Sequence, residues 1–138
     1  MTADFSLDGQ IALVTGASSG LGRSFASFLA KAGASVVLAA RHIDQCAKAA
    51  DQIIGTTLPI SIDVTDPTSI NAALRTIEQN FGTVTILINN AGTVINNLLV
   101  ETSTADWRQV INTNLTGCFL MTQAISRSLI ASENTGRI

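Results

Sequence analysis

The sequence has no tyrosine, one histidine, two cysteines and two prolines among its 138 residues. Charged residues make up 13%, with eight Lys and Arg against ten Asp and Glu, and the basic residues form no cluster. Binding to a phosphate backbone needs such a cluster, so we expect no nucleic-acid partner. Cys46 and Cys118 have no spacing typical of a disulfide framework or a zinc site. We therefore expect no metal site and a reduced, cytoplasmic protein.

Two long stretches lack charge altogether, residues 82–100 and 109–126. Both contain several Asn or Gln side chains, which makes them poor candidates for membrane spans. Residues 1–9, MTADFSLDG, contain no basic and apolar signal region. The sequence thus predicts a soluble chain with neither a membrane partner nor a targeting segment.

Apolar residues are 46% of the chain, which is enough to bury the core of a single domain spanning residues 1–138. Compact apolar runs alternate with segments whose apolar residues recur at helical spacing. Strands are predicted at 10–14, 35–40, 58–62 and 84–88, and helices at 21–32, 44–54, 67–81 and 103–132. Continuous rather than alternating apolar strands indicate a parallel sheet buried on both faces. Right-handed crossovers then predict an α/β, doubly wound fold.

A glycine-rich loop, TGASSGLG at residues 15–22, joins the first strand to the first helix. A helix N-terminus offers free N–H groups and a positive dipole end to a phosphate, and glycines allow close approach. A P-loop would close with Gly-Lys-Ser/Thr, whereas this loop closes with Gly22-Arg23-Ser24, which disfavours triphosphate hydrolysis. The alternative is an ordinary strand-to-helix turn.

Three motifs together resemble the short-chain dehydrogenase/reductases: TGASSGLG, Asp63-Val64 after the third strand, and Asn89-Asn90-Ala91-Gly92 after the fourth. Their order and spacing match the family over essentially the whole chain. The resemblance implies a Rossmann-type sheet in the order 3-2-1-4, with helices on both faces and a dinucleotide at the point where the order reverses. The chain would be the N-terminal, cofactor-binding portion of an oxidoreductase acting on a carbonyl or alcohol substrate.

The resemblance also implies the residues that contact the cofactor. Asp63 would accept a hydrogen bond from the adenine amino group, with Val64 against the ring, although a solvated strand end is the alternative for Asp63. The NNAG turn would lie beside the ribose, or would only hold the fold. The full set of expected contacts is Gly16, Ser18, Ser19, Gly20, Leu21, Gly22, Arg41, Asp63, Val64, Asn90, Ala91 and Gly92.

Cofactor choice depends on the end of the second strand. An acid there would bind the ribose 2′-hydroxyl of NAD, but the position holds Ala40, and Arg41 follows it. A guanidinium binds phosphate, which favours NADP(H) over NAD(H). A surface arginine is the alternative, and we expect the neighbouring His42 to be exposed.

The last predicted helix carries Asn114. Regular helical spacing places Asn114 in the middle of an apolar, and therefore buried, face, where its amide needs partners. The resemblance implies that Asn114 is a catalytic residue, which holds a water through its backbone in a proton relay; a structural contact between helices is the alternative. In relatives the same helix contributes to a dimer, so a homo-oligomer through 103–132 is expected. The other residues predicted on this face are Trp107, Val110, Ile111, Cys118 (as a core residue), Met121 and Ile125.

The family's chemistry also needs a Ser, a Tyr and a Lys four residues after the Tyr. This chain has no Tyr, and both of its lysines, Lys31 and Lys48, fall on early helices. Residues 136–138, Gly-Arg-Ile, resemble the opening of the next strand. We therefore expect a sheet truncated after the start of its fifth strand, an exposed apolar edge at the fourth strand, and no turnover by these residues alone.

Two other functions stay open at this stage. A non-catalytic dinucleotide-binding or interaction module could pair with a full-length relative. An S-adenosylmethionine methyltransferase shares the glycine turn, but it gives no reason for NNAG and would favour an acid over Arg41.

Overall fold

The computed structural model describes residues 5–138, so the first four residues of the segment searched for a signal region lie outside it. Strands and helices alternate along the first two thirds of the chain, and a long helix follows. The elements are β1 (Ile11–Thr15), α1 (Gly20–Lys31), β2 (Ser35–Ala40), α2 (Ile43–Ala50), β3 (Thr57–Ser61), α3 (Pro67–Asn80), β4 (Ile86–Ile88), η1 (Leu99–Glu101), α4 (Thr104–Ile111), η2 (Asn112–Thr116) and α5 (Gly117–Ala131).

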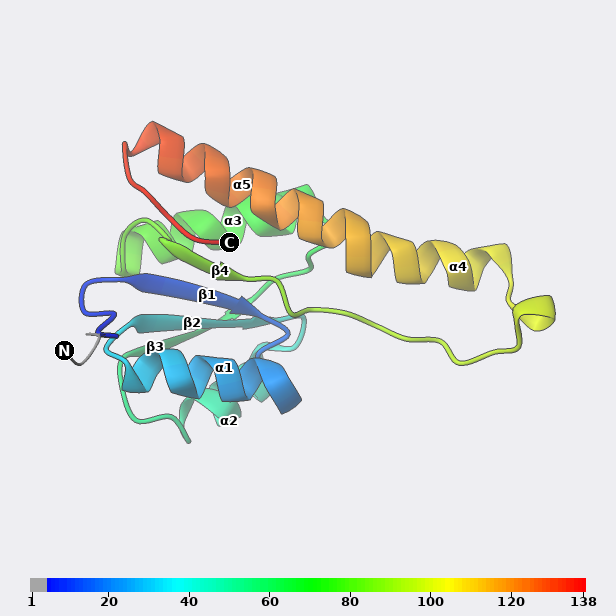
Figure 1. The fold of residues 1–138 in the computed structure, drawn as a ribbon, viewed down its shortest axis with the longest axis horizontal. Coiled ribbons are helices and arrows are strands. Elements are labelled where there is room, and N and C mark those ends of the chain that lie inside the picture. Colours follow the sequence, from blue (N-terminus) through cyan, green and yellow to red (C-terminus); the bar gives the residue numbers. More distant parts are fainter. Residues whose placement is uncertain (1–4) are drawn as a thin grey trace.

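The four strands form one parallel sheet in the order β3-β2-β1-β4. At the centre of the sheet Val14 lies opposite Leu38 on β2 and Ile88 on β4. Helices α1 and α2 cover one face, and α3 and α5 cover the other (Figure 1). The predicted doubly wound architecture and strand order are confirmed, and the order reverses between β1 and β4.

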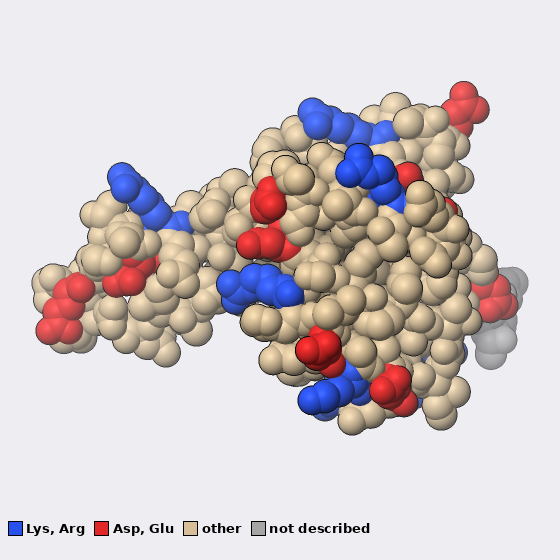
Figure 2. Space-filling view, turned by 180° about the vertical axis from the view of Figure 1, so that it is seen from behind, with Lys and Arg blue, Asp and Glu red and all other residues tan. Residues whose placement is uncertain are grey.

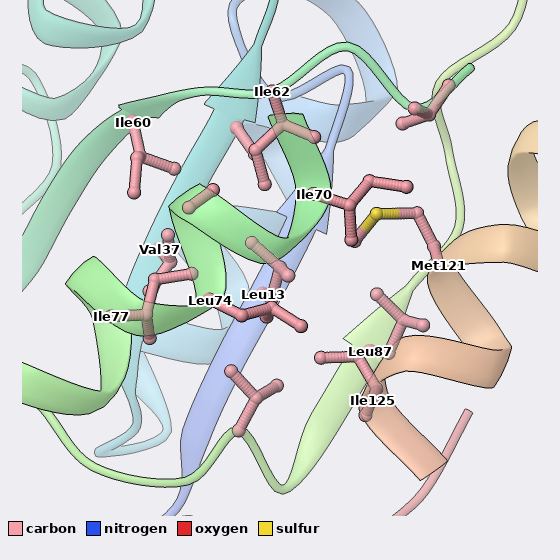
Figure 3. Packing of buried hydrophobic residues seen from close by; sticks show 14 of the residues in the cluster. Leu13, Val37, Ile60, Ile62, Ile70, Leu74, Ile77, Leu87, Met121 and Ile125 are labelled. Carbon is pink, nitrogen blue, oxygen red and sulfur yellow. The ribbon is translucent and has the colours of Figure 1, made fainter. Parts of the chain in front are cut away.

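The core consists of two layers, one on each side of the sheet. Between the sheet and α3 and α5, large aliphatic side chains interlock around Leu13 and Leu87, with Met121 and Ile125 supplied by α5 (Figure 3). The other layer is built mainly from small residues, including Ala26 on α1. Fully burying one large aliphatic side chain contributes about 1.5–3 kcal/mol, so the α3/α5 layer supplies much of the hydrophobic stabilisation.

The apolar residues at 21, 25, 28, 29 and 32 recur at helical spacing and predict one buried face for α1, but the helix buries a different face. Its buried residues are Gly22, Ala26 and Ala30, whereas Leu21 and Phe28 are 70% and 69% exposed. Both faces have helical spacing, so periodicity alone could not choose between them. Small residues win because they allow α1 to lie close to the sheet.

Helix α2 ends at Ala50, earlier than the predicted end before Gly55, and Ile54 is 88% exposed. The chain turns over residues 51–55 to reach β3, and Gly55, at φ +138°, passes Ala30 of α1. The sequence predicts Asp44 as a possible N-cap of this helix, but Asp44 lies in the first turn of α2 and the N-cap is His42.

Asp66 before Pro67, and Ser103 three residues before Asp106, predict helix N-caps, and both caps are confirmed. The side chain of Asp66 accepts a hydrogen bond from the Thr68 N–H at 2.9 Å, and Pro67 follows as the first helical residue. The hydroxyl of Ser103 accepts from the Asp106 N–H at 3.0 Å.

Residues near the end of the chain add to the free edge of β4. Arg137 donates its N–H to the Thr85 carbonyl and accepts from the Leu87 N–H, both at 2.9 Å, in a parallel bridge opposite Ile86. The predicted opening of a fifth strand is therefore present. The expectation of an exposed apolar edge is wrong for Ile86 and Leu87, because both are buried.

The predicted helix 103–132 is a continuous rod with a π-helical turn, η2, between α4 and α5. Only α5 lies over the sheet, while α4 and the segment leading to it extend away from the body of the molecule (Figure 1). No helix within residues 5–138 combines the length and apolar character that crossing a bilayer requires.

Candidate functional site

A cavity of about 530 Å³ lies at the carboxyl ends of the strands. The loops after all four strands line it, together with part of α4 and η2. The structure brings most of the predicted contacts to this cavity: Gly16, Ser18, Ser19, Arg41, Asp63, Val64, Asn90, Ala91 and Gly92. Gly20, Leu21 and Gly22 form the first turn of α1 and do not line it, and neither does Asn114.

Thr15, at the end of β1, joins the glycine loop to the NNAG turn. Its hydroxyl is buried, accepts from the N–H groups of Asn90 (3.0 Å) and Ala91 (2.9 Å), and donates to the Ile88 carbonyl (3.3 Å). The Asn90 amide in turn donates to the carbonyls of Thr15 and Gly16 at 3.0 and 3.2 Å. The NNAG turn therefore holds the fold at this edge. The role of Thr15 was not predicted from the sequence. The feature that could have indicated it is a single hydroxyl-bearing residue at the end of an apolar strand.

The N-terminus of α1 is left without a side-chain cap. Ser19 occupies the N-cap position but makes no capping hydrogen bond, so the N–H groups of the first turn have no partner within the helix. Gly20 has φ +54°, and the space where a Cβ would stand is open. These features suit an anion, which the helix dipole would also stabilise.

Gly22 has a different role from Gly20. A Cβ at Gly22 would meet the Gly16 carbonyl oxygen, and it would stand 2.5 Å from the Asn90 amide nitrogen. The absence of a side chain here lets α1 begin directly against the two loops, so this glycine serves packing rather than ligand approach.

The carboxylate of Asp63 is held at the end of β3. Its Oδ1 accepts from the Thr65 hydroxyl at 2.7 Å and the Thr65 N–H at 2.9 Å. The hydroxyl bond is the largest cause of a lowered Asp63 pKa; the N–H bond and the charge of Arg41 add to it, against a smaller rise from burial. The site therefore presents an ionised carboxylate near a guanidinium. Arg41 is exposed, and so is His42, as predicted.

Asn114 is exposed, and its predicted burial is wrong. Its Oδ1 accepts from the Thr93 N–H at 2.8 Å and its Nδ2 donates to the Thr93 carbonyl at 2.9 Å. The amide thus has the partners that sequence reasoning required, but from the segment after NNAG rather than from a core. The physical reason is that α4 extends beyond the sheet and has little to pack on.

The rest of that predicted face is buried only in part. Trp107 on α4 is 60% exposed and Cys118 is exposed, so the expectation that Cys118 is a core residue is also wrong. Met121 and Ile125, which lie over the sheet, are fully buried as predicted.

The cavity therefore combines four features at one sheet edge. These are Ser19, the N-cap residue at the uncapped start of α1, a guanidinium, an ionised carboxylate and the apolar side chain of Val64. In open α/β sheets, ligands bind where the strand order reverses, which here is between β1 and β4. The arrangement fits a ligand that has several phosphates and a flat ring with an amino group.

The family model described as short chain dehydrogenase matches residues 10–138. The chain belongs to this family. It is 39% identical over 132 residues to 3-oxoacyl-(acyl-carrier-protein) reductase FabG of Vibrio harveyi, covering 96% of this chain and 54% of that protein. It is also 39% identical over 131 residues to the FabG reductase of Escherichia coli K12, covering 95% and 53%.

The fold comparison agrees with the sequence comparison. The crystal structure of a short-chain type dehydrogenase/reductase from Mycobacterium marinum superimposes with a TM-score of 0.92 at 36% identity, covering 96% of this chain and 53% of that one. The chain spans about half the length of the curated relatives it matches, and it corresponds to the N-terminal portion of the family.

Proposed function

We propose that the chain binds NADP(H) and forms the cofactor-binding half of an oxidoreductase that interconverts a carbonyl and an alcohol. The observation that carries the choice of NADP(H) is Arg41 at the rim of the cavity, with Ala40 at the strand end where an acid would select NAD. A planar guanidinium binds phosphate well, whereas a carboxylate would repel it. NAD(H) is the weaker ligand in this proposal.

Each part of the cofactor has a matching group. The N–H groups at the start of α1 would hold the pyrophosphate, Arg41 the 2′-phosphate, and Asp63 the adenine amino group beside Val64. The remaining expected contacts, in the glycine loop and the NNAG turn, shape the backbone next to them. When bound, the cofactor supplies hydride transfer at its nicotinamide ring.

Asn114 would act through its backbone in a proton relay. Its side-chain amide is already bonded on both sides by Thr93, which leaves the main chain for a water. The π-helical turn around Asn114 departs from the regular helical hydrogen-bonding pattern, and such turns occur frequently at functional sites.

The chain contains no Tyr to serve as the family's acid/base. We therefore propose that these 138 residues alone do not turn over substrate. The second candidate function, a non-catalytic dinucleotide-binding module that pairs with a full-length relative, is favoured by the same observation.

The proposed setting is cytoplasmic, with a small-molecule substrate and a homo-oligomer formed through residues 103–132. Nucleic acid and membrane are not proposed as partners. In Figure 2 the Lys and Arg side chains are interspersed with Asp and Glu on the face shown rather than gathered into one patch, which supports this proposal.

The test is an equilibrium titration of the purified chain with NADPH and, separately, with NADH, measured by calorimetry. Tighter binding of NADPH is expected, and tighter binding of NADH would overturn the assignment. A second assay adds a carbonyl substrate and follows NADPH absorbance. Substrate-dependent oxidation of NADPH by the pure chain contradicts the proposed inactivity. The pairing module is favoured if an inactivated full-length relative regains activity only when it is mixed with this chain.

A further inference from the structure

The turn after β3 fixes Asp63 from two sides. Its side-chain Oδ1 accepts both hydrogen bonds from Thr65, an Asx-type turn reinforced by the hydroxyl. Its main-chain N–H donates to the Ser69 hydroxyl on α3 at 2.9 Å, and its carbonyl accepts from the Asp66 N–H at 3.1 Å. The position of the carboxylate is therefore set by the turn that leads into α3 and by the start of that helix.

The two oxygens of this carboxylate are used unequally. Oδ1 receives both donors, while Oδ2 makes no hydrogen bond to any residue in the range 5–138. Asp63 is half-buried and lines the cavity together with Val64. One carboxylate oxygen is thus available to a ligand, and its orientation is fixed in advance, which lowers the cost of binding.

Arg41 is the competing partner for this oxygen. It lines the same cavity, and its charge reaches Asp63, yet the two groups form no direct ion pair within the described part of the chain. A carboxylate released from Thr65 could rotate toward the guanidinium. That rotation would occupy both groups at once, because each would then neutralise the other.

We propose that Thr65 is a positioning residue for cofactor recognition, because its hydroxyl holds the carboxylate of Asp63 away from Arg41. The carboxylate can then accept a hydrogen bond from the adenine amino group. The Arg41 guanidinium stays available to the 2′-phosphate. This inference rests on the proposed function. It adds that the discrimination of adenine depends on a side chain that does not itself contact the amino group.

The experiment compares wild type with Thr65→Val, which removes the hydroxyl at nearly constant volume, and with Thr65→Ser, which keeps it. Thr76→Val is the matched control, because the Thr76 hydroxyl bonds only to the Ala72 carbonyl on the exposed side of α3. Binding of NADPH and of its hypoxanthine analogue, which has a carbonyl in place of the amino group, is measured by calorimetry. Circular dichroism checks folding, and Thr65→Ala replaces the Val variant if that variant does not fold.

Wild type should bind NADPH about 10-fold or more tightly than the analogue, since a hydrogen bond to a charged acceptor is at stake. Thr65→Val should weaken NADPH binding about 3- to 10-fold and reduce the ratio between the two ligands. Thr65→Ser and Thr76→Val should behave like wild type.

Two failures can be told apart. If wild type binds neither ligand, the proposed function is wrong and this inference is wrong with it. The other failure is a wild type that prefers NADPH to the hypoxanthine analogue, with the same ratio of affinities in Thr65→Val, or with the ratio lost in Thr65→Ser. In that case Thr65 does not position the carboxylate, and the proposed function stands.

Discussion

At the residue scale, the site is made by a few polar side chains that directly follow buried strands. Thr15 ends β1, Arg41 follows β2 and Asp63 follows β3, so all three lie together at the carboxyl ends of the strands. Each acts on its neighbours by short-range contacts that substitutions can test separately.

Arg41→Ala should weaken NADPH binding about 10- to 100-fold, the value of one or two charge-assisted hydrogen bonds, and change NADH binding by about twofold at most. Titration calorimetry with both cofactors measures the effect. Arg75→Ala, on the exposed side of α3, is the control. An equal loss for both cofactors would show that Arg41 does not select the 2′-phosphate.

Asp63 should make the free energy of unfolding depend on pH in the acid range. Its pKa in the folded chain is lowered, chiefly by the Thr65 hydroxyl. The stabilisation is therefore complete above the unfolded pKa of about 3.9 and is lost as the pH falls through the lower folded value. Urea unfolding should find wild type more stable than Asp63→Asn at pH 7, with the difference vanishing in acid. A difference that stays constant with pH contradicts this account, and Asp51→Asn serves as control.

Residue burial on helices was the least predictable property. A sequence wheel assumes one regular helix with a partner along its whole length, but η2 breaks the regular turn and α4 has no sheet beneath it. The predicted buried face is therefore real only for Met121 and Ile125 over the sheet, and it does not include Asn114 or Cys118. The motif residues Asp63 and Asn90 were placed correctly because their position depends only on where strands end.

At the element scale, the sequence pattern was sufficient to predict the strands and two helix caps, whereas the spatial order of the strands came from the family resemblance. Apolar runs gave the strands, and local hydrogen bonding by Asp66 and Ser103 gave the starts of α3 and α4. The end of α2 was not predictable, because residues 51–55 form a turn that tertiary contact with α1 imposes.

The junction of β1 and β4 should depend on the Thr15 hydroxyl. Thr15→Val leaves the N–H groups of Asn90 and Ala91 without their acceptor in a partly buried place, which should cost about 2–4 kcal/mol of unfolding free energy. Thr15→Ser keeps the hydroxyl and should lose about 1 kcal/mol, the value of a buried methyl group. Urea denaturation compares them, and equal stability of the two variants would refute this role.

At the scale of the whole molecule, the rod formed by α4, η2 and α5 leaves apolar side chains exposed to solvent. Leu115 and Phe119 are 64% and 58% exposed on the rod formed by α4, η2 and α5. Contiguous exposed apolar surface of this kind marks an interface, and it supports the proposed homo-oligomer through 103–132.

Light scattering after size exclusion should therefore give a mass of at least two chains for wild type. The double variant Leu115→Glu/Phe119→Glu should be monomeric, because two carboxylates cannot be buried unpaired at a symmetric contact. Ile54→Glu, 88% exposed beyond α2, should keep the wild-type mass. A monomeric wild type rules out this interface.

We propose that a dinucleotide binds at the carboxyl ends of the strands, where the strand order reverses between β1 and β4. The decisive measurement is a crystal structure of the chain with NADP⁺. We expect pyrophosphate oxygens within hydrogen-bonding distance of the first N–H groups of α1, and the 2′-phosphate on Arg41. An ordered cofactor bound at another surface, or a correctly formed cavity left empty at saturating NADP⁺, would contradict it.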